Sequence, residues 1–162
     1  MLVHLLGKQF NGGKEGTNQR FHKNGKLKEE FIIVDGKLEG SYKVWSKNGT
    51  LIYHCRYVDG KEDGEVNAWH SSGKRMISGN YVKGKKHGVF LGYFDGILNE
   101  EANFVDNRLH GSYKCWENGL LIEEATFNEG KLHGDFREWR DGKMTRHLVY
   151  DKGNVKFIKS LL

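Results

Sequence analysis

The sequence has no proline, only two cysteines and no long apolar run among its 162 residues. The lack of proline beside 22 glycines excludes collagen-like and Pro-rich disordered chains. It favours many tight turns between strands whose backbone N–H groups are all needed. Apolar residues make up 37%, which is low for a compact globule, and no apolar stretch approaches the ~20 residues needed to cross a bilayer.

The few cysteines and the opening residues bear on the compartment. Cys55 and Cys115 occupy different places in the repeat described below, so we expect no disulfide, two small packed thiols and a reducing environment. Residues 1–6 have no basic segment before them, and their apolar stretch is too short for a signal peptide. These features predict a cytoplasmic protein, located in the host cytoplasm or the virion if its source is viral.

Charge of one sign is not in large excess. The 26 Lys and Arg and 21 Asp and Glu leave a net charge of +5, and the two signs are interleaved, as on an ordinary solvated surface. The densest basic cluster consists of Lys83, Lys85, Lys86 and His87. It is a candidate anion-binding site for phospholipid or nucleic acid, with exposed turn residues as the simpler interpretation.

A repeat of 23 to 24 residues organises the chain. One glycine, which we call the marker glycine, recurs in six copies, and four residues before it stands a second glycine in most copies, with Asn107 once in its place. Asn tolerates positive φ, so this exception indicates a backbone reason for the column. The marker glycines are Gly16, Gly40, Gly64, Gly88, Gly111 and Gly134.

An aromatic residue follows each marker glycine by five positions, and a second turn comes next. In the first three copies this turn reads like Lys23-Asn24-Gly25, which suits a three-residue loop with a left-handed glycine. In the last three it is Asp95-Gly96, Asn118-Gly119 and Asp141-Gly142, which favours tight type I′ hairpins. This difference of one residue explains the change of period from 24 to 23, and we expect the two halves to meet near Gly92.

Between the turns, apolar residues alternate as in strands, and no segment has a helical period over enough length. The sequence therefore predicts an all-β fold: a single-layer, twisted, antiparallel β-meander, or open β-solenoid, of about six hairpin repeats. Residues 1–9 are expected to cap one end, residues 10–149 to form the six repeats, and residues 150–162 to add a closing strand.

Candidate functional residues follow the same period. An open sheet cannot bury both faces by itself, so aromatic rows are candidate protein-binding residues, although packing of repeat on repeat is the simpler interpretation for each. His87, His110 and His133 precede consecutive marker glycines, but at ~10 Å per repeat one metal ion cannot span them. We expect no catalytic residue, no metal site and no cofactor. The protein-binding candidates are Trp45, Trp69, Tyr93, Trp116 and Trp139.

The repeated Tyr-x-x-Gly-Lys-x-x-Gly core resembles the MORN-repeat family. Its clearest copies are residues 57–64, 81–88 and 127–134, and the Trp-x-x-Gly-x-Leu element after them resembles variant MORN repeats of bacterial antitoxin-like and large DNA virus proteins. The first copy departs from the pattern, being one residue short between Phe10 and Gly16, which puts the N-terminal hairpin in doubt.

The resemblance implies β-hairpin rods that pair into dimers and bind proteins, some with links to phospholipids. The leading hypothesis is a non-catalytic protein-interaction or scaffolding module that binds a partner, or itself as a homodimer, along an aromatic-rich sheet surface. Two alternatives remain open: an antitoxin-like inhibitor of a partner toxin, suggested by the resemblance alone, and an anionic phospholipid or nucleic-acid binder acting through residues 83–87.

Overall fold

The computed structural model describes residues 12–160, and all of their regular structure is β-strand. This confirms the all-β prediction for the described residues. The cap predicted for residues 1–9 lies outside them, as do Phe10 and Asn11. The strands are β1 (Gly16–Phe21), β2 (Leu27–Val34), β3 (Lys37–Trp45), β4 (Leu51–Val58), β5 (Lys61–Trp69), β6 (Arg75–Val82), β7 (Lys85–Lys86), β8 (Gly88–Phe94), β9 (Ile97–Val105), β10 (Arg108–Glu117), β11 (Leu120–Asn128), β12 (Lys131–Arg140), β13 (Lys143–Asp151) and β14 (Asn154–Ile158).

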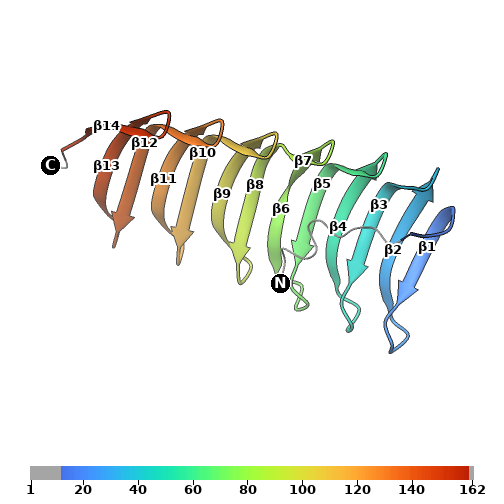
Figure 1. Cartoon of the computed structure of the whole chain (residues 1–162). Helices are drawn as coiled ribbons and strands as arrows, with labels where there is room; N and C mark the ends of the chain where they lie inside the picture. Colours follow the sequence, from blue (N-terminus) through green and yellow to red (C-terminus); the bar gives the residue numbers. More distant parts are fainter. Residues whose placement is uncertain (1–11, 161–162) are drawn as a thin grey trace.

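These strands form one open antiparallel sheet in which each strand pairs with its neighbours in the sequence (Figure 1). The short β7 pairs with β6 beside the main path, which passes from β6 to β8. β1 pairs regularly with β2 from Gly16 onward, so the first hairpin is formed despite the short spacing before it. At the other end, β14 pairs with β13 as a closing strand. The two ends of the sheet lie far apart, and the sheet is not closed into a barrel.

The marker glycines form one row across the sheet, because each pairs with the large apolar residue at the same place in the next strand. Gly40 lies opposite Tyr57, and the later copies repeat this pairing. Every marker glycine has positive φ, between 72° and 112°, a region that L-residues rarely adopt. The remaining pairs are Gly16 with Ile33, Gly64 with Tyr81, Gly88 with Phe104, Gly111 with Phe127, and Gly134 with Tyr150.

The two predicted hairpin types are both present. In the first three repeats only the glycine of the turn has positive φ, as in Gly25, whose N–H donates to the His22 carbonyl at 2.9 Å. In the last three repeats both central residues are left-handed, as in Asp95 (φ 52°) and Gly96 (φ 84°), which is the type I′ geometry. The change occurs at β8, which contains Gly92.

A bulge lies beside the marker glycines Gly40, Gly64, Gly111 and Gly134, and at Gly88 the strand is interrupted between β7 and β8. Between β11 and β12, for example, Ala125 pairs with Phe136 but Phe127 pairs with Leu132, so β12 has additional residues around Gly134 at this point. A second register shift falls just before the aromatic residue that follows the marker glycine by five positions, such as Trp116. Bulges increase local bend and twist, and they account for the curved strands of Figure 1.

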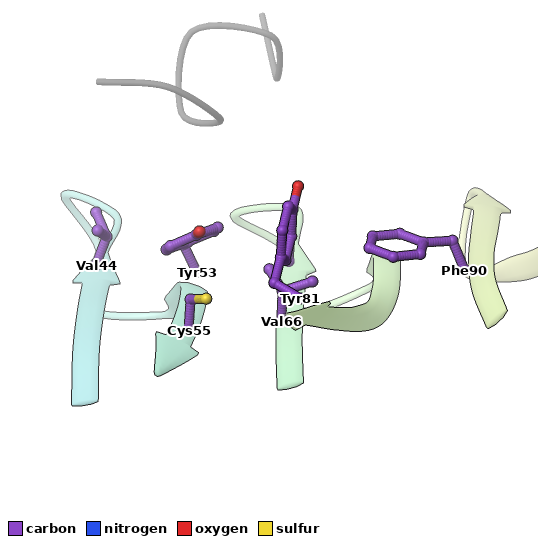
Figure 2. Close-up of a cluster of buried hydrophobic side chains, with 7 residues drawn as sticks. Val44, Tyr53, Cys55, Val66, Tyr81 and Phe90 are labelled. Atoms are coloured by element: carbon purple, nitrogen blue, oxygen red, sulfur yellow. The ribbon is translucent and has the colours of Figure 1, made fainter. Parts of the chain in front are cut away.

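The core lies on one face of the sheet. Val44, Tyr53, Cys55, Val66 and Phe90 extend from the same side of their strands and form a buried cluster (Figure 2). A second cluster of Phe31, Ile33 and Leu38 continues it toward β1. We call the side that carries these residues the aromatic face, and the opposite side the polar face.

Candidate binding surface

One row of the aromatic face alternates large and small side chains along the sheet. Strand pairing places a larger side chain of one strand opposite a smaller one of the next, which is Cys, Gly or Ala in four of the five pairs and Leu in the last. Gly79 is the extreme case, since an added Cβ would lie 2.5 Å from the Phe90 ring. The pairs are Tyr42 with Cys55, Val66 with Gly79, Phe90 with Ala102, Tyr113 with Ala125, and Phe136 with Leu148.

Diagonal neighbours in this row and the next form perpendicular ring pairs. Tyr113 and Phe127 have centroids 6.0 Å apart at 78°, and Phe136 and Tyr150 are 5.9 Å apart at 75°. The same pair occurs earlier as Phe90 and Phe104, at 5.4 Å and 78°. Edge-to-face pairs of this kind add about 0.5–1.5 kcal/mol beyond their buried area. The rings of the aromatic rows are therefore packed and fixed in orientation.

Burial on this face falls toward the C-terminus. Phe31 and Tyr53 are 1% exposed, and Phe90 is 7% exposed. The rings equivalent to Phe90 in later repeats, Tyr113 and Phe136, are half-buried, as is Tyr42 at the same position in the first half. Most fully buried rings of the aromatic face thus lie in the first half of the sheet. In the second half Ala102 and Ala125 are buried, but the rings beside them stay partly accessible.

An acidic row replaces apolar residues on the same accessible half. Tyr53, Ala68 and Ile77 occupy this register position in the earlier strands. Farther along, Glu100 pairs with Cys115, Cys115 pairs with Glu123, and Glu123 pairs with Glu138. We call Glu100, Glu123 and Glu138 the acidic row.

The acids of this row interact unfavourably with one another. Burial, and then the neighbouring Glu138 carboxylate, raise the pKa of Glu123. Glu138 is paired with Arg146, Oε2 to Nη1, at 3.1 Å. Within residues 12–160, neither Glu100 nor Glu123 forms an ion pair. The row is a site of negative charge that the chain itself only partly neutralises.

The tyrosine and thiol groups beside this row are held in their protonated forms. Burial raises the pKa of Tyr113 to about 12, and the carboxylates of Glu100 and Glu123 contribute. Burial also raises the pKa of the Cys115 thiol, again with help from Glu100 and Glu123. Cys55 is fully buried, and its burial raises the thiol pKa to about 12. Both cysteines are free, as the sequence predicted, and neither is activated as a thiolate.

The polar face, by contrast, pairs its charges. Glu124 lies next to Glu123 in the chain but on the opposite face, where its Oε2 accepts a hydrogen bond from Arg137 at 2.8 Å. Lys114 Nζ is 3.9 Å from the same carboxylate. Asp135 accepts hydrogen bonds from His147 at 2.6 Å and Lys159 at 3.1 Å, which lower the pKa of its carboxyl. This face is a solvated ladder of compensated charges.

The aromatic column predicted to bind a partner lies next to the hairpin turns. Trp45, Trp69, Tyr93, Trp116 and Trp139 are all half-buried and stand where the register shifts. The Arg75 guanidinium lies over the Tyr93 ring, 5.8 Å from its centroid. These five residues remain candidates, and they lie one step from the acidic row along each strand rather than among the packed ring pairs.

The predicted anion-binding cluster is divided by the fold. Lys85 Nζ is 3.6 Å from Asp106, and His87 Nδ1 is 4.0 Å from the same carboxylate. Lys86 turns onto the aromatic face, where its Nζ is 4.9 Å from the centroids of both Phe90 and Phe104. Lys83 holds a left-handed turn position and donates its N–H to Asp63 at 3.2 Å. Lys86 therefore lies apart from Lys85 and His87, which are both beside Asp106.

A capping role for the residue before each marker glycine was not evident from the sequence. Glu15 and Glu39 each accept a hydrogen bond from the first left-handed residue of the next turn, Asp35 N–H and Asp59 N–H, at 2.9 Å. In later repeats histidine takes this place, and His133 Nδ1 is 3.3 Å from Asp151. The change from an acid to histidine at this position was the feature of the sequence that could have indicated this capping role.

The structure brings no metal-binding group together within residues 12–160: no three His, Cys, Asp or Glu side chains are clustered there. In the same residues, no helix is long and apolar enough to span a membrane.

Comparison with protein families agrees with the repeat geometry. The family model described as MORN repeat variant matches residues 14–32 and 38–59, which cover β1, most of β2 and β3, and β4. No curated protein matches the chain. The same row of marker glycines continues beyond the matched residues to Gly134.

Proposed function

We propose a non-catalytic protein-interaction or scaffolding module, in which residues 14–32 and 38–59 match the MORN repeat variant model, that binds a partner along the aromatic face. The observation that carries this proposal is the accessible second half of that face. There the rings of Tyr113, Phe127 and Phe136 are half-buried in a sheet that has no second layer among residues 12–160. Apolar rows of this kind mark interaction surfaces.

The face is suited to binding because it is ordered in advance. The turns of successive repeats are joined by backbone hydrogen bonds, such as Gly130 N–H to the Leu109 carbonyl at 2.8 Å and Gly153 N–H to the Leu132 carbonyl at 2.8 Å. The ring pairs are held edge to face. A partner therefore meets a surface that loses little conformational entropy on binding.

The titratable groups of this face support a binding role rather than a chemical one. Tyr113, Cys55 and Cys115 all have raised pKa values, so they stay protonated and weakly nucleophilic near neutral pH. MORN repeats generally act as non-catalytic modules, in keeping with the matched family.

Affinity capture with face-specific variants tests the proposal. The tagged chain is compared with Tyr113→Ser/Phe136→Ser on the aromatic face and with Leu91→Ser on the polar face, in a lysate of the organism that encodes it. Circular dichroism establishes that each variant is folded, and light scattering reports self-association. We expect wild type and Leu91→Ser to retain a partner or a second copy that the double variant loses. Equal retention by all three folded proteins, or none by any, would contradict the proposal.

A further inference from the structure

Two adjacent repeats carry the same acid–aromatic unit on the aromatic face. β9 contains Glu100-x-Ala102-x-Phe104, and β11 contains Glu123-x-Ala125-x-Phe127. Alternate residues of a strand share a face, so in each unit the acid and the ring lie on one side with a small alanine between them. At this place β4 and β6 have Tyr53-x-Cys55-x-Tyr57 and Ile77-x-Gly79-x-Tyr81. β2 has an acid there, in Glu29-x-Phe31-x-Ile33. Arg20 of β1 pairs with Glu29 at 2.9 Å, and its guanidinium lies over the Phe31 ring, 5.0 Å from the centroid.

Lys86 shows how a cation sits on these rings. Its Nζ is 4.9 Å from the centroids of Phe90 and Phe104, within the range in which a cation is attracted to an aromatic face. Its backbone N–H donates to Asn107 at 2.7 Å, which fixes the strand there. The chain thus uses one of its own lysines to cover the first ring pair of the second half.

The next two ring pairs lack such a lysine. The positions equivalent to Lys86 are Leu109 and Leu132, which pair with Phe104 and Phe127. Among residues 12–160, no cation lies over the pair of Tyr113 and Phe127. Glu100 on β9 and Glu123 on β11 lie on the two strands that pair with β10, which carries Tyr113, and they have no ion-pair partner among residues 12–160. The rings and acids that would hold a cation are present, and the cation must come from outside.

The acidic row is also poorly explained by folding. Glu123 and Glu138 lie directly opposite each other on paired strands, and like charges in this arrangement destabilise a sheet. On the polar face the neighbouring Glu124 is compensated by Arg137 at 2.8 Å. Local conflicts of this kind are expected at functional sites.

We infer that the aromatic face from β9 to β12 binds an extended basic peptide, with a lysine or arginine stem over the Tyr113–Phe127 pair and its charge beside Glu100 and Glu123. This inference rests on the proposed function and names the chemistry of its partner. β9 and β11 are two strands apart, or about 10 Å. A polyproline II peptide rises about 9.3 Å over three residues, so basic residues at every third position match the two units.

Fluorescence polarisation with a synthetic probe tests the inference. The probe is a labelled peptide with lysine at every third position among alanine and proline, and its control has glutamate in place of lysine. We expect the lysine peptide to bind the full-length chain and the glutamate peptide not to bind. Glu100→Gln/Glu123→Gln should weaken binding by about tenfold or more, since tenfold corresponds to only 1.4 kcal/mol and two charge contacts are lost.

A matched variant separates the effect of the charges at this site from the effect of changing the net charge of the protein. Glu101→Gln/Glu124→Gln removes the same charge from the next residue of each strand, on the polar face, and should leave the affinity within about twofold. Phe127→Leu, which keeps an apolar side chain without a ring, should weaken binding by about threefold or more. Circular dichroism checks the fold of each variant.

Equal weakening by both charge variants, or no binding of the lysine peptide by wild type, would overturn the inference. In that case the capture experiment still decides the proposed function, because it depends on Tyr113 and Phe136 and not on the acidic row. Conversely, peptide binding that survives Glu100→Gln/Glu123→Gln would reject the acidic row while leaving a partner surface intact.

Discussion

Gly79 faces the Phe90 ring so closely that a Cβ at residue 79 would lie 2.5 Å from it. Phe90 cannot easily withdraw, because Tyr81 and Phe104 pack against it with centroids at 5.5 and 5.4 Å. We expect Gly79→Ala to destabilise the protein by about 1–3 kcal/mol through overpacking, measured by urea unfolding. Ser78→Ala, on the opposite face of the same strand, is the control. A Gly79→Ala variant as stable as Ser78→Ala would show that the ring moves freely.

Glu129 occupies a left-handed turn position, with φ of 49°, where three of the other copies have aspartate and two have lysine. An L-residue without a short polar side chain is disfavoured there by roughly 1–2 kcal/mol, and asparagine less so. We therefore expect Glu129→Asn to stabilise the protein by about 0.5–1 kcal/mol, detected as a rise in Tm. Glu117→Asn, at an exposed strand end, should give no such rise, and equal effects would argue against a backbone cause.

Glu39 joins one repeat to the next through the hydrogen bond from Asp59 N–H to its Oε2 at 2.9 Å. Glu39→Ala leaves that N–H to water, and we expect a loss of about 0.5–1.5 kcal/mol in the free energy of unfolding. Glu65→Ala removes an exposed acid of the next repeat without this bond and serves as the comparison. The two variants should differ in denaturant midpoint and have equal m-values. Equal midpoints would show that the Glu39 hydrogen bond does not stabilise the fold.

Glu123 makes stability depend on pH. Its pKa is raised in the folded protein by burial and by Glu138, so the folded state holds this proton more tightly than the unfolded state does. The penalty is present above the folded pKa and disappears as pH falls below the ordinary value of an unfolded glutamate. Glu123→Gln should therefore be more stable than wild type at neutral pH, by less than about 1 kcal/mol for a partly solvated group. The difference in Tm should vanish in acid, and a gain that persists there would have another cause.

Much of the fold could be predicted from the spacing of glycines, because positive φ restricts which residues a turn accepts. The pairs Asp95-Gly96 and Asn118-Gly119 identified type I′ turns, and Gly25 identified the longer loop; all three have the expected backbone. Asn107 in a glycine column was likewise informative, since its φ is 70°.

The binding surface was harder to predict because it depends on register across bulges. The acidic row appears only when Glu100, Cys115, Glu123 and Glu138 are aligned over four strands, and each hairpin contains irregular pairing. The aromatic column beside the turns has the clearest sequence signal, yet the ring pairs and acids lie in the middle of the strands. The placement of Lys86 on the aromatic face, over Phe90 and Phe104, likewise depends on the fold of the strands and could not be predicted from composition.

Intermolecular nuclear Overhauser effects between the lysine peptide and the full-length chain test the central claim most directly. The account predicts contacts from the lysine ε-methylene protons to the ring protons of Tyr113 and Phe127. Contacts confined to the polar face, for instance to Leu91, or to the Trp116 column alone, would contradict it.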